Sequence, residues 1–272
     1  MIRDLHSHST ASDGLLTPTA LVQRAFEQQV GMLALTDHDT IAGVAEAKQA
    51  AQSLPISLIT GVEISILWQG KTIHLTALNI DEQNAQLCEL LHRQAELRQT
   101  RAEQIGEKLA KAGIPNAYEG AKSLASGEIT RAHYARFLVA NGYVNNDEQA
   151  FKRYLGMGKT AYVKPIWCSM EEAIAATHQA GGVICVAHPL RYKFTARWVR
   201  RLIEEFKQAG GDGIEVAGCG QTPDQRQLLA RWATEFDLYS SAGSDFHYPA
   251  GWIELGKGLI LPAQCKPIWD LF

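Results

Sequence analysis

Residues 4–13 read Asp4-Leu5-His6-Ser7-His8-Ser9-Thr10-Ala11-Ser12-Asp13, and the organisation of the remaining chain follows from them. Residues 2–5 have the pattern of a short strand, so His6 and His8 come at its C-terminal end. In extended backbone, residues i and i+2 point to the same side. Both imidazoles can therefore reach one metal ion, and Asp13 can return to it from the following loop. A His-x-His pair alone is a weak signature, so the prediction depends on further ligands along the chain.

The composition excludes several classes of protein. The chain has 272 residues, 46% of them apolar, which suffices for one large core or one core with a small insertion. A net charge of −3 disfavours a protein that coats long duplex nucleic acid, although it permits a local basic pocket. No apolar run predicts a membrane span, and the N-terminus lacks the apolar core of a signal peptide. Five scattered cysteines without a Cys-x-x-Cys motif are typical of reduced thiols, so we expect a cytoplasmic protein.

Apolar strands alternate with helices along most of the chain. Strands are predicted at residues 2–5, 32–36, 56–60, 183–187, 213–216 and 238–242, and a hairpin at 64–68 and 72–78. Helices are predicted at residues 17–30, 41–52, 169–180, 195–209 and from 222 onward. Thr17-Pro18 and Thr222-Pro223 are helix-start signals, and Ser169 with Glu172 forms a capping box. This alternation predicts an α/β fold built on parallel strands.

The middle of the chain departs from this alternation. Residues 81–111 predict one or two long helices, and the following residues to about 163 contain helical stretches but no convincing apolar strand. We therefore predict that residues 1–98 and 167–272 form one discontinuous α/β domain, and that residues 99–166 are a helical insertion over its site. Within the insertion a helix starts after Thr130, which brings Arg131 close to the anion-attracting N-terminus of that helix.

Most of the predicted strands end in a residue that can bind a metal ion. Together with Asp13 and a histidine inside the hairpin, the candidates are His6, His8, Asp13, His38, Glu63, His74, His188, Asp245 and His247. In barrels of parallel strands the reactive groups collect at the C-terminal face of the strands. A single buried histidine is usually an ordinary hydrogen-bonded core residue, but so many ligands at successive strand ends predict one shared site. Asp212 and Glu215 are weaker candidates, and His92 and His178 fall inside predicted helices.

The ligand types indicate the kind of metal. Imidazole and carboxylate without thiolate suit Mn, Fe, Zn or Co rather than an iron–sulfur cluster or a cysteine-rich structural zinc site. Nine candidates exceed what one ion needs, so we expect two or three divalent ions, Mn first among the four metals. Sites with several ions typically hydrolyse bonds to phosphorus.

Six short motifs follow one another in a recognisable order. They are His6-Ser-His8, Thr36-Asp37-His38-Asp39, Gly61-Val-Glu63-Ile, His74-Leu, Ala187-His188-Pro189 and Ser244-Asp245-Phe-His247. Together they resemble the PHP (polymerase and histidinol phosphatase) family, over the whole chain apart from the insertion. The resemblance implies a distorted seven-stranded β/α barrel with a trinuclear metal site. The runs 129–136 and 188–192 look like one branch of that family, which contains 3′,5′-nucleoside bisphosphate phosphatases and a 5′→3′ exoribonuclease.

The resemblance also implies roles for the matching residues. One ion would be held by His6, His8, Glu63 and Asp245; a second, bridged by Glu63, by His74 and His188; and the third by Asp13, His38 and His247. Glu63, Asp245 and His247 would act directly in catalysis. Some relatives carry histidine at the position of Asp13. We assign phosphate binding to Arg131, His133, Arg136, Arg191 and Lys164, since arginine forks suit phosphate oxygens.

The expected activity is metal-assisted hydrolysis of a phosphoester. The substrate would be a nucleoside 3′,5′-bisphosphate that loses its 3′-phosphate, or a short 5′-phosphorylated oligoribonucleotide that is trimmed from its 5′ end. A histidinol-phosphate or general phosphomonoesterase is an alternative, as is a PHP module without catalysis that serves as an interaction domain. The sequence indicates neither a membrane partner nor an oligomeric state.

Overall fold

A seven-stranded sheet forms the centre of the molecule. The computed structural model describes all residues from Met1 to Phe272. Its strands are β1 (Ile2–Asp4), β2 (Val30–Leu35), β3 (Ser57–Trp68), β4 (Lys71–Leu78), β5 (Val183–Val186), β6 (Gly213–Gly218) and β7 (Tyr239–Gly243). Neighbouring strands pair in chain order, and only β4 is antiparallel to its neighbours.

The first and last strands meet, so the sheet is closed. The backbone N–H of Leu5 donates to the carbonyl of Ala242 at 2.8 Å, and Ser7 forms a parallel bridge with Phe246. The prediction of a distorted seven-stranded β/α barrel is therefore confirmed, and the antiparallel β4 is its main distortion. Closure leaves no free sheet edge and brings the C-terminal ends of the six parallel strands to one pole.

The strand β3 is longer than predicted. Residues 56–60 and 64–68 were expected as separate strands, but they belong to one strand that pairs first with β2 and then with β4. Gly61 permits this because a Cβ there would lie 2.8 Å from Cγ2 of Thr36. The hairpin to β4 turns over Gln69 and Gly70, which both have positive φ, as a type I′ turn requires.

Five helices accompany the parallel strands. They are α1 (Pro18–Glu27), α2 (Val44–Ala51), α7 (Met170–Gln179), α8 (Ala196–Gln208) and α9 (Pro223–Glu235). The side chains of Thr17, Ser169 and Thr222 cap α1, α7 and α9 as predicted. However, α2 begins later than residue 41, because Asp39 has a left-handed backbone and the Thr40 hydroxyl accepts from the N–H of Ala42.

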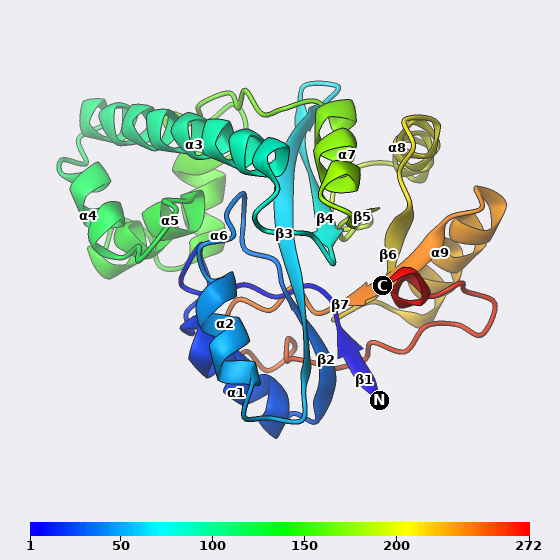
Figure 1. Cartoon of the computed structure of the whole chain (residues 1–272). Coiled ribbons are helices and arrows are strands. Elements are labelled where there is room, and N and C mark those ends of the chain that lie inside the picture. The colour runs from blue at the N-terminus through cyan, green and yellow to red at the C-terminus, as the bar shows by residue number, and fades with distance from the viewer.

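The helix α3 (Ala85–Lys111) connects two separate cores. Its first half packs on the barrel through Leu87, Leu90 and Leu91, and its second half packs through Ala102 and Ile105 on a smaller core within residues 102–163. The remaining elements are α4 (Ala117–Ser123), α5 (Arg131–Ala140), α6 (Asp147–Ala150), η1 (Phe151–Leu155) and the C-terminal η2 (Ile268–Leu271). Figure 1 shows α3 extending away from the sheet with α4 and α5 beneath it. No helix combines the length and apolar character needed to cross a membrane.

Candidate metal centre

All nine predicted ligand side chains lie at one pole of the barrel. His6 and His8 follow β1, His38 follows β2, His188 follows β5, and the pair Asp245 and His247 follows β7. Glu63 and His74 lie within β3 and β4, and Asp13 reaches the group from the loop before α1. The side chains of His6, His8 and Glu63 are fully buried.

Glu63 is the centre of this arrangement. Its two carboxylate oxygens lie between 2.8 and 3.4 Å from a ring nitrogen of five different histidines, namely His6, His8, His38, His74 and His188. A single carboxylate cannot accept good hydrogen bonds from five imidazoles, whereas a carboxylate that bridges metal ions can be surrounded in this way.

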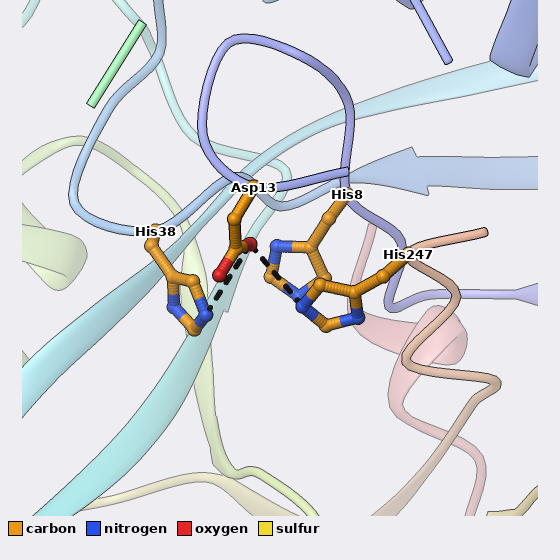
Figure 2. Close-up of side chains that lie close together, drawn as sticks. All are labelled: His8, Asp13, His38 and His247. Atoms are coloured by element: carbon orange, nitrogen blue, oxygen red, sulfur yellow. Dashed lines mark ion pairs between the residues drawn. The ribbon is translucent and has the colours of Figure 1, made fainter. Parts of the chain in front are cut away.

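The distances divide the nine side chains into three overlapping groups, each with its ligand atoms within 4.8 Å of one another. The groups are His6, Glu63, His188 and Asp245; His38, Glu63 and His74; and His8, Asp13, His38 and His247. Figure 2 shows the last of these, with Asp13 between His38 and His247. His8 also lies close to the first group, because its Nε2 is 3.4 Å from Glu63 and 3.2 Å from Asp245, as the resemblance implies for the first ion.

The unpaired atoms of these side chains fit a bound cation. Four buried atoms that face the cluster have no hydrogen bond of good geometry in the protein: Asp13 Oδ1, His38 Nδ1, Glu63 Oε2 and His74 Nδ1. Buried polar atoms are seldom left without a partner, so such a concentration calls for an explanation. Imidazole and carboxylate are the donor set of Mn, Fe, Zn and Co sites.

The electrostatics of the cluster favour ligands in their deprotonated forms. Burial would raise the pKa of Glu63, Asp13 and Asp245, but the surrounding imidazoles hold all three well below the usual range. Burial, together with His247 and His38, lowers the pKa of His8 to about 3. Burial opposes the charge on His247 too, yet Asp13 and Asp245 raise its pKa to about 9. An arriving cation therefore meets ionised carboxylates and must displace a proton from His247.

Glu215 supports the cluster from outside. Its carboxylate accepts from Nδ1 of His6 at 2.5 Å and from the backbone N–H of His188 at 2.6 Å. The first contact orients the His6 ring so that Nε2 faces the centre, which is the usual role of an outer carboxylate at a metal site. From the sequence Glu215 was only a weak ligand candidate, and its position in the predicted strand at residues 213–216 was the available signal.

The insertion reaches the cluster through Asp13. The hydroxyl of Thr130 donates to Asp13 Oδ2 at 3.1 Å, and the Arg136 guanidinium donates to the Asp13 carbonyl oxygen. His133 is buried and accepts the backbone N–H of Thr130 at 3.0 Å as part of the capping box of α5. Burial lowers the pKa of His133 to about 4, so the ring is neutral near pH 7. Thr130 and Arg136 thus hold Asp13 in place, and His133 supports Thr130.

A cavity of about 120 Å³ lies between the cluster and the insertion. Its walls include Asp13, His38 and His74 of the cluster and the three arginines Arg98, Arg101 and Arg131. The only aromatic contact of Arg131 is the Phe151 ring, 5.5 Å from its guanidinium carbon, and no carboxylate pairs with it. Burial, together with neighbouring Arg131 and Arg98, lowers the pKa of Arg101 to about 9. Arg98 pairs with Asp39, whereas Arg101 and Arg131 have no carboxylate partner, and such cations beside a metal-binding cluster suit an anion.

The predicted phosphate-binding residues thus have different positions. Arg131 lines the cavity beside the insertion, whereas Arg191 pairs with Asp245 and lines a second cavity on the opposite side of the cluster. Lys164 is exposed and lines neither cavity. Arg98 and Arg101 were missed; they lie three residues apart on α3 and therefore share a face, which was the signal that the sequence offered.

Comparison with known proteins agrees with this geometry. Residues 4–164 match the PHP domain. A 5′-3′ exoribonuclease of Haemophilus influenzae is 61% identical over 99% of this chain and 98% of its own length. A 3′,5′-nucleoside bisphosphate phosphatase of Chromobacterium violaceum is 42% identical over 98% of this chain and 94% of its own length. The structure of an amidohydrolase from Chromobacterium violaceum, with bound sulfate and no metal, has a TM-score of 0.94 and 41% identity, over 100% of this chain and 96% of that one. The chain therefore belongs to the PHP family.

Proposed function

We propose that this protein is a metal-dependent phosphoesterase that removes the 3′-phosphate from nucleoside 3′,5′-bisphosphates and trims short 5′-phosphorylated oligoribonucleotides from the 5′ end. The observation that carries the proposal is the convergence of nine imidazole and carboxylate side chains at one pole, next to a cavity lined by Arg101 and Arg131, which have no carboxylate partner. Relatives that cover nearly the whole chain are named for these two activities.

The nine side chains would hold two or three divalent ions, with Mn preferred over Fe, Zn or Co. Bound ions supply hydroxide near neutral pH and neutralise the charge that develops on the phosphoryl oxygens. The protein contributes a rigid frame for them. Glu215 orients His6, and Thr130 and Arg136 hold Asp13.

We assign His247 a role at the departing 3′-oxygen. Its Nδ1 donates to the backbone carbonyl oxygen of Asp245 at 3.0 Å, which leaves Nε2 directed at Asp13, 3.2 Å away. Nε2 can bind an ion when the ring is neutral, or it can donate a proton to the 3′-oxygen when the ring is charged. It cannot do both at once, so we assign His247 to the third ion and to proton delivery when that ion is absent.

Arg131 and Arg101 would grip the 5′-phosphate, which is not cleaved. Ions alone suffice to hydrolyse a phosphate ester, so arginines beside them make sense as recognition of a second phosphate. Binding energy from that remote group can be used to align the scissile bond. Lys164 and Arg191 remain proposed phosphate contacts. Arg191 is proposed because it lies beside Asp245, one of the metal ligands.

A substrate panel tests the proposal. Adenosine 3′,5′-bisphosphate should be cleaved to 5′-AMP and phosphate at least about 100-fold faster than 3′-AMP in kcat/KM, because a charge-assisted arginine–phosphate contact contributes about 1.5–3 kcal/mol. EDTA should abolish the reaction and Mn²⁺ should restore it. Equal rates for the two substrates would support a general phosphomonoesterase instead. Absence of hydrolysis with two to three equivalents of metal bound would support a module without catalysis.

A further inference from the structure

The second cavity beside the metal centre has a distinct chemistry. It has a volume of about 330 Å³, which falls within the range of small-molecule sites. His188 and Glu215 form part of its wall, so it adjoins the cluster, yet it shares no residue with the cavity that contains Arg131. The cavity with Arg131 lies at the ends of β2 to β4, and the second cavity lies at the ends of β5 to β7. The metal centre is therefore located between the two cavities.

An aromatic ring stands at the edge of this second cavity. Trp252 is 60% exposed, an unusual degree for so large an apolar side chain. A Cβ at Gly220 would lie 3.6 Å from the Trp252 ring, and Gly220 has a φ of +74°, so the wall beside the ring is bare backbone. An exposed indole above an open space is the usual platform on which a nucleobase stacks.

Two amides in the cavity offer hydrogen-bond donors. The Oε1 atom of Gln221 accepts from the backbone N–H of Gly218, and that of Gln225 accepts from the backbone N–H of Thr222, both at 2.9 Å. Because backbone N–H groups can only donate, these contacts fix which end of each amide is oxygen. Both Nε2 groups remain without a partner in the protein. They can donate to the ring nitrogens and carbonyl oxygens of a base or to a ribose hydroxyl.

A positive charge marks the boundary between this cavity and the metal centre. The Arg191 guanidinium donates to Asp245 and, at 3.4 Å, to the carbonyl of Ser244. The carboxylate of Glu215, in contrast, is engaged by His6 and His188. The wall therefore presents donors and one cation but no free carboxylate, which suits an oligonucleotide.

We propose that this cavity binds the second nucleotide of a 5′-phosphorylated RNA strand. The proposal rests on the proposed function, in which the 5′-phosphate of the first nucleotide binds near Arg131 and its 3′-phosphorus lies at the metal centre. In a phosphodiester that phosphorus also carries the 5′-oxygen of the next nucleotide. The strand must therefore continue on the side away from Arg131, where Trp252 stacks the second base and Gln221 donates to it.

When the strand binds in this position, each hydrolysis produces a shorter strand that is again a substrate. The oxygen of water bonds to phosphorus, the bond from phosphorus to the first 3′-oxygen breaks, and that oxygen takes a proton. The first nucleotide leaves as a 5′-monophosphate, and the remaining strand keeps a 5′-phosphate. The shortened strand thus carries the same group that the site beside Arg131 recognises.

The test compares two substrates that differ only by the second nucleoside. These are adenosine 3′,5′-bisphosphate and the 5′-phosphorylated dinucleotide pApA, assayed with the Mn²⁺-loaded full chain. Trp252→Ala should lower kcat/KM for pApA by about 5- to 100-fold, as expected for loss of one stacked base, and should change the value for the bisphosphate less than twofold. Trp252→Phe should restore most of the loss. Gln221→Glu, which keeps the acceptor for Gly218 but removes the donor, should also affect pApA alone.

Trp198→Ala is the matched control, because Trp198 is a partly exposed tryptophan of α8 outside both cavities. It should leave both substrates at the wild-type rate. The proposal is overturned if Trp252→Ala slows both substrates equally, which would place the first nucleoside in this cavity, or if it slows neither. If the wild type cleaves the bisphosphate but not pApA, the inference fails together with the trimming part of the proposed function, and the removal of the 3′-phosphate stands. If it cleaves neither substrate, the proposed function fails with it.

Discussion

Glu63 is the residue on which the metal centre depends most, because five imidazoles face its carboxylate. Glu63→Ala should reduce kcat by about 10³-fold or more, since ions that share this ligand lose their bridge. Metal content, measured by elemental analysis of the same preparation, should fall in parallel. His92→Ala is the control, because His92 is an exposed residue of α3 that pairs only with Glu96. Comparable losses in the two variants would show that the site is misplaced.

Arg131 should determine the preference for a second phosphate. Arg131→Ala should lower kcat/KM for adenosine 3′,5′-bisphosphate by about 10- to 100-fold and leave the slow hydrolysis of 3′-AMP nearly unchanged, because only the bisphosphate makes the lost contact. Lys152→Ala, which removes an exposed cation of the insertion, serves as the control. A loss of the same size on both substrates would instead assign Arg131 to the scissile phosphate.

At the scale of a residue, the sequence predicted the cluster better than its surroundings. A histidine or carboxylate at a strand end can be recognised from the local sequence. The closed barrel then brings these side chains to one pole, and this does not depend on the details of core packing. Arg136 and His133 lie on the predicted helix that follows Thr130, and their side chains contact Asp13 and Thr130, respectively, rather than lining the cavity. Which partner a side chain finds depends on tertiary contacts that no local pattern encodes.

Among the elements, α3 is attached to the barrel by a buried ion pair. Arg98 donates to Asp39 at 2.7 Å and to the hydroxyl of Ser65 at 2.8 Å, and Gln94 donates to Asp39 at 3.1 Å. Arg98→Met should destabilise the protein by about 3–5 kcal/mol, because it leaves the Asp39 carboxylate buried without its cation. Arg93→Met, on the same helix but in an exposed pair with Glu172, should cost no more than about 1 kcal/mol. Chemical denaturation measures both, and equal effects would contradict the role of the pair.

The same pair predicts a dependence on pH. Burial would raise the pKa of Asp39, but Arg98 and the hydrogen bonds from Ser65 hold it below its usual value. A carboxyl group with a lowered folded-state pKa stabilises the protein above its unfolded pKa, near 4, and this contribution is lost as the pH falls through the folded value. The difference in stability between wild type and Arg98→Met should therefore be constant from pH 7 to about 5 and should shrink in stronger acid. A difference that grows on acidification would contradict this assignment.

Helix starts were predictable where a side-chain cap was present, as at Thr17, Ser169 and Thr222. The start of α2 was not, because its N-cap is Gly43, which offers no side chain. The continuity of β3 was also hidden, since Gly61 is read locally as a break. A glycine is required at this position because a Cβ would clash with Thr36, which follows the neighbouring strand β2.

For the whole molecule, bound metal should contribute strongly to stability. A ligand present at ~100 times its Kd stabilises the folded state by about 2.7 kcal/mol, which for a chain of this size raises Tm by roughly 5–10 °C. Mn²⁺ added to protein stripped with EDTA should produce such a shift in a thermal melt, and His92→Ala should show it unchanged. Glu63→Ala should lose most of it. A shift that persists undiminished in Glu63→Ala would indicate that the stabilising ion binds elsewhere.

The contact between Thr130 and Asp13 has a thermodynamic consequence for the molecule as a whole. One carboxylate oxygen of Asp13 accepts a hydrogen bond from the hydroxyl of Thr130 in the insertion, and the other faces His38 and His247. The insertion and one group of ligands therefore share a single carboxylate. An anion bound beside Arg131 can change the affinity with which Asp13, His38 and His247 bind a metal ion. Thermodynamic linkage then requires that the metal ion change the affinity of the protein for the anion by the same factor. Titrating Mn²⁺ with and without inorganic phosphate, and phosphate with and without Mn²⁺, should yield one coupling constant.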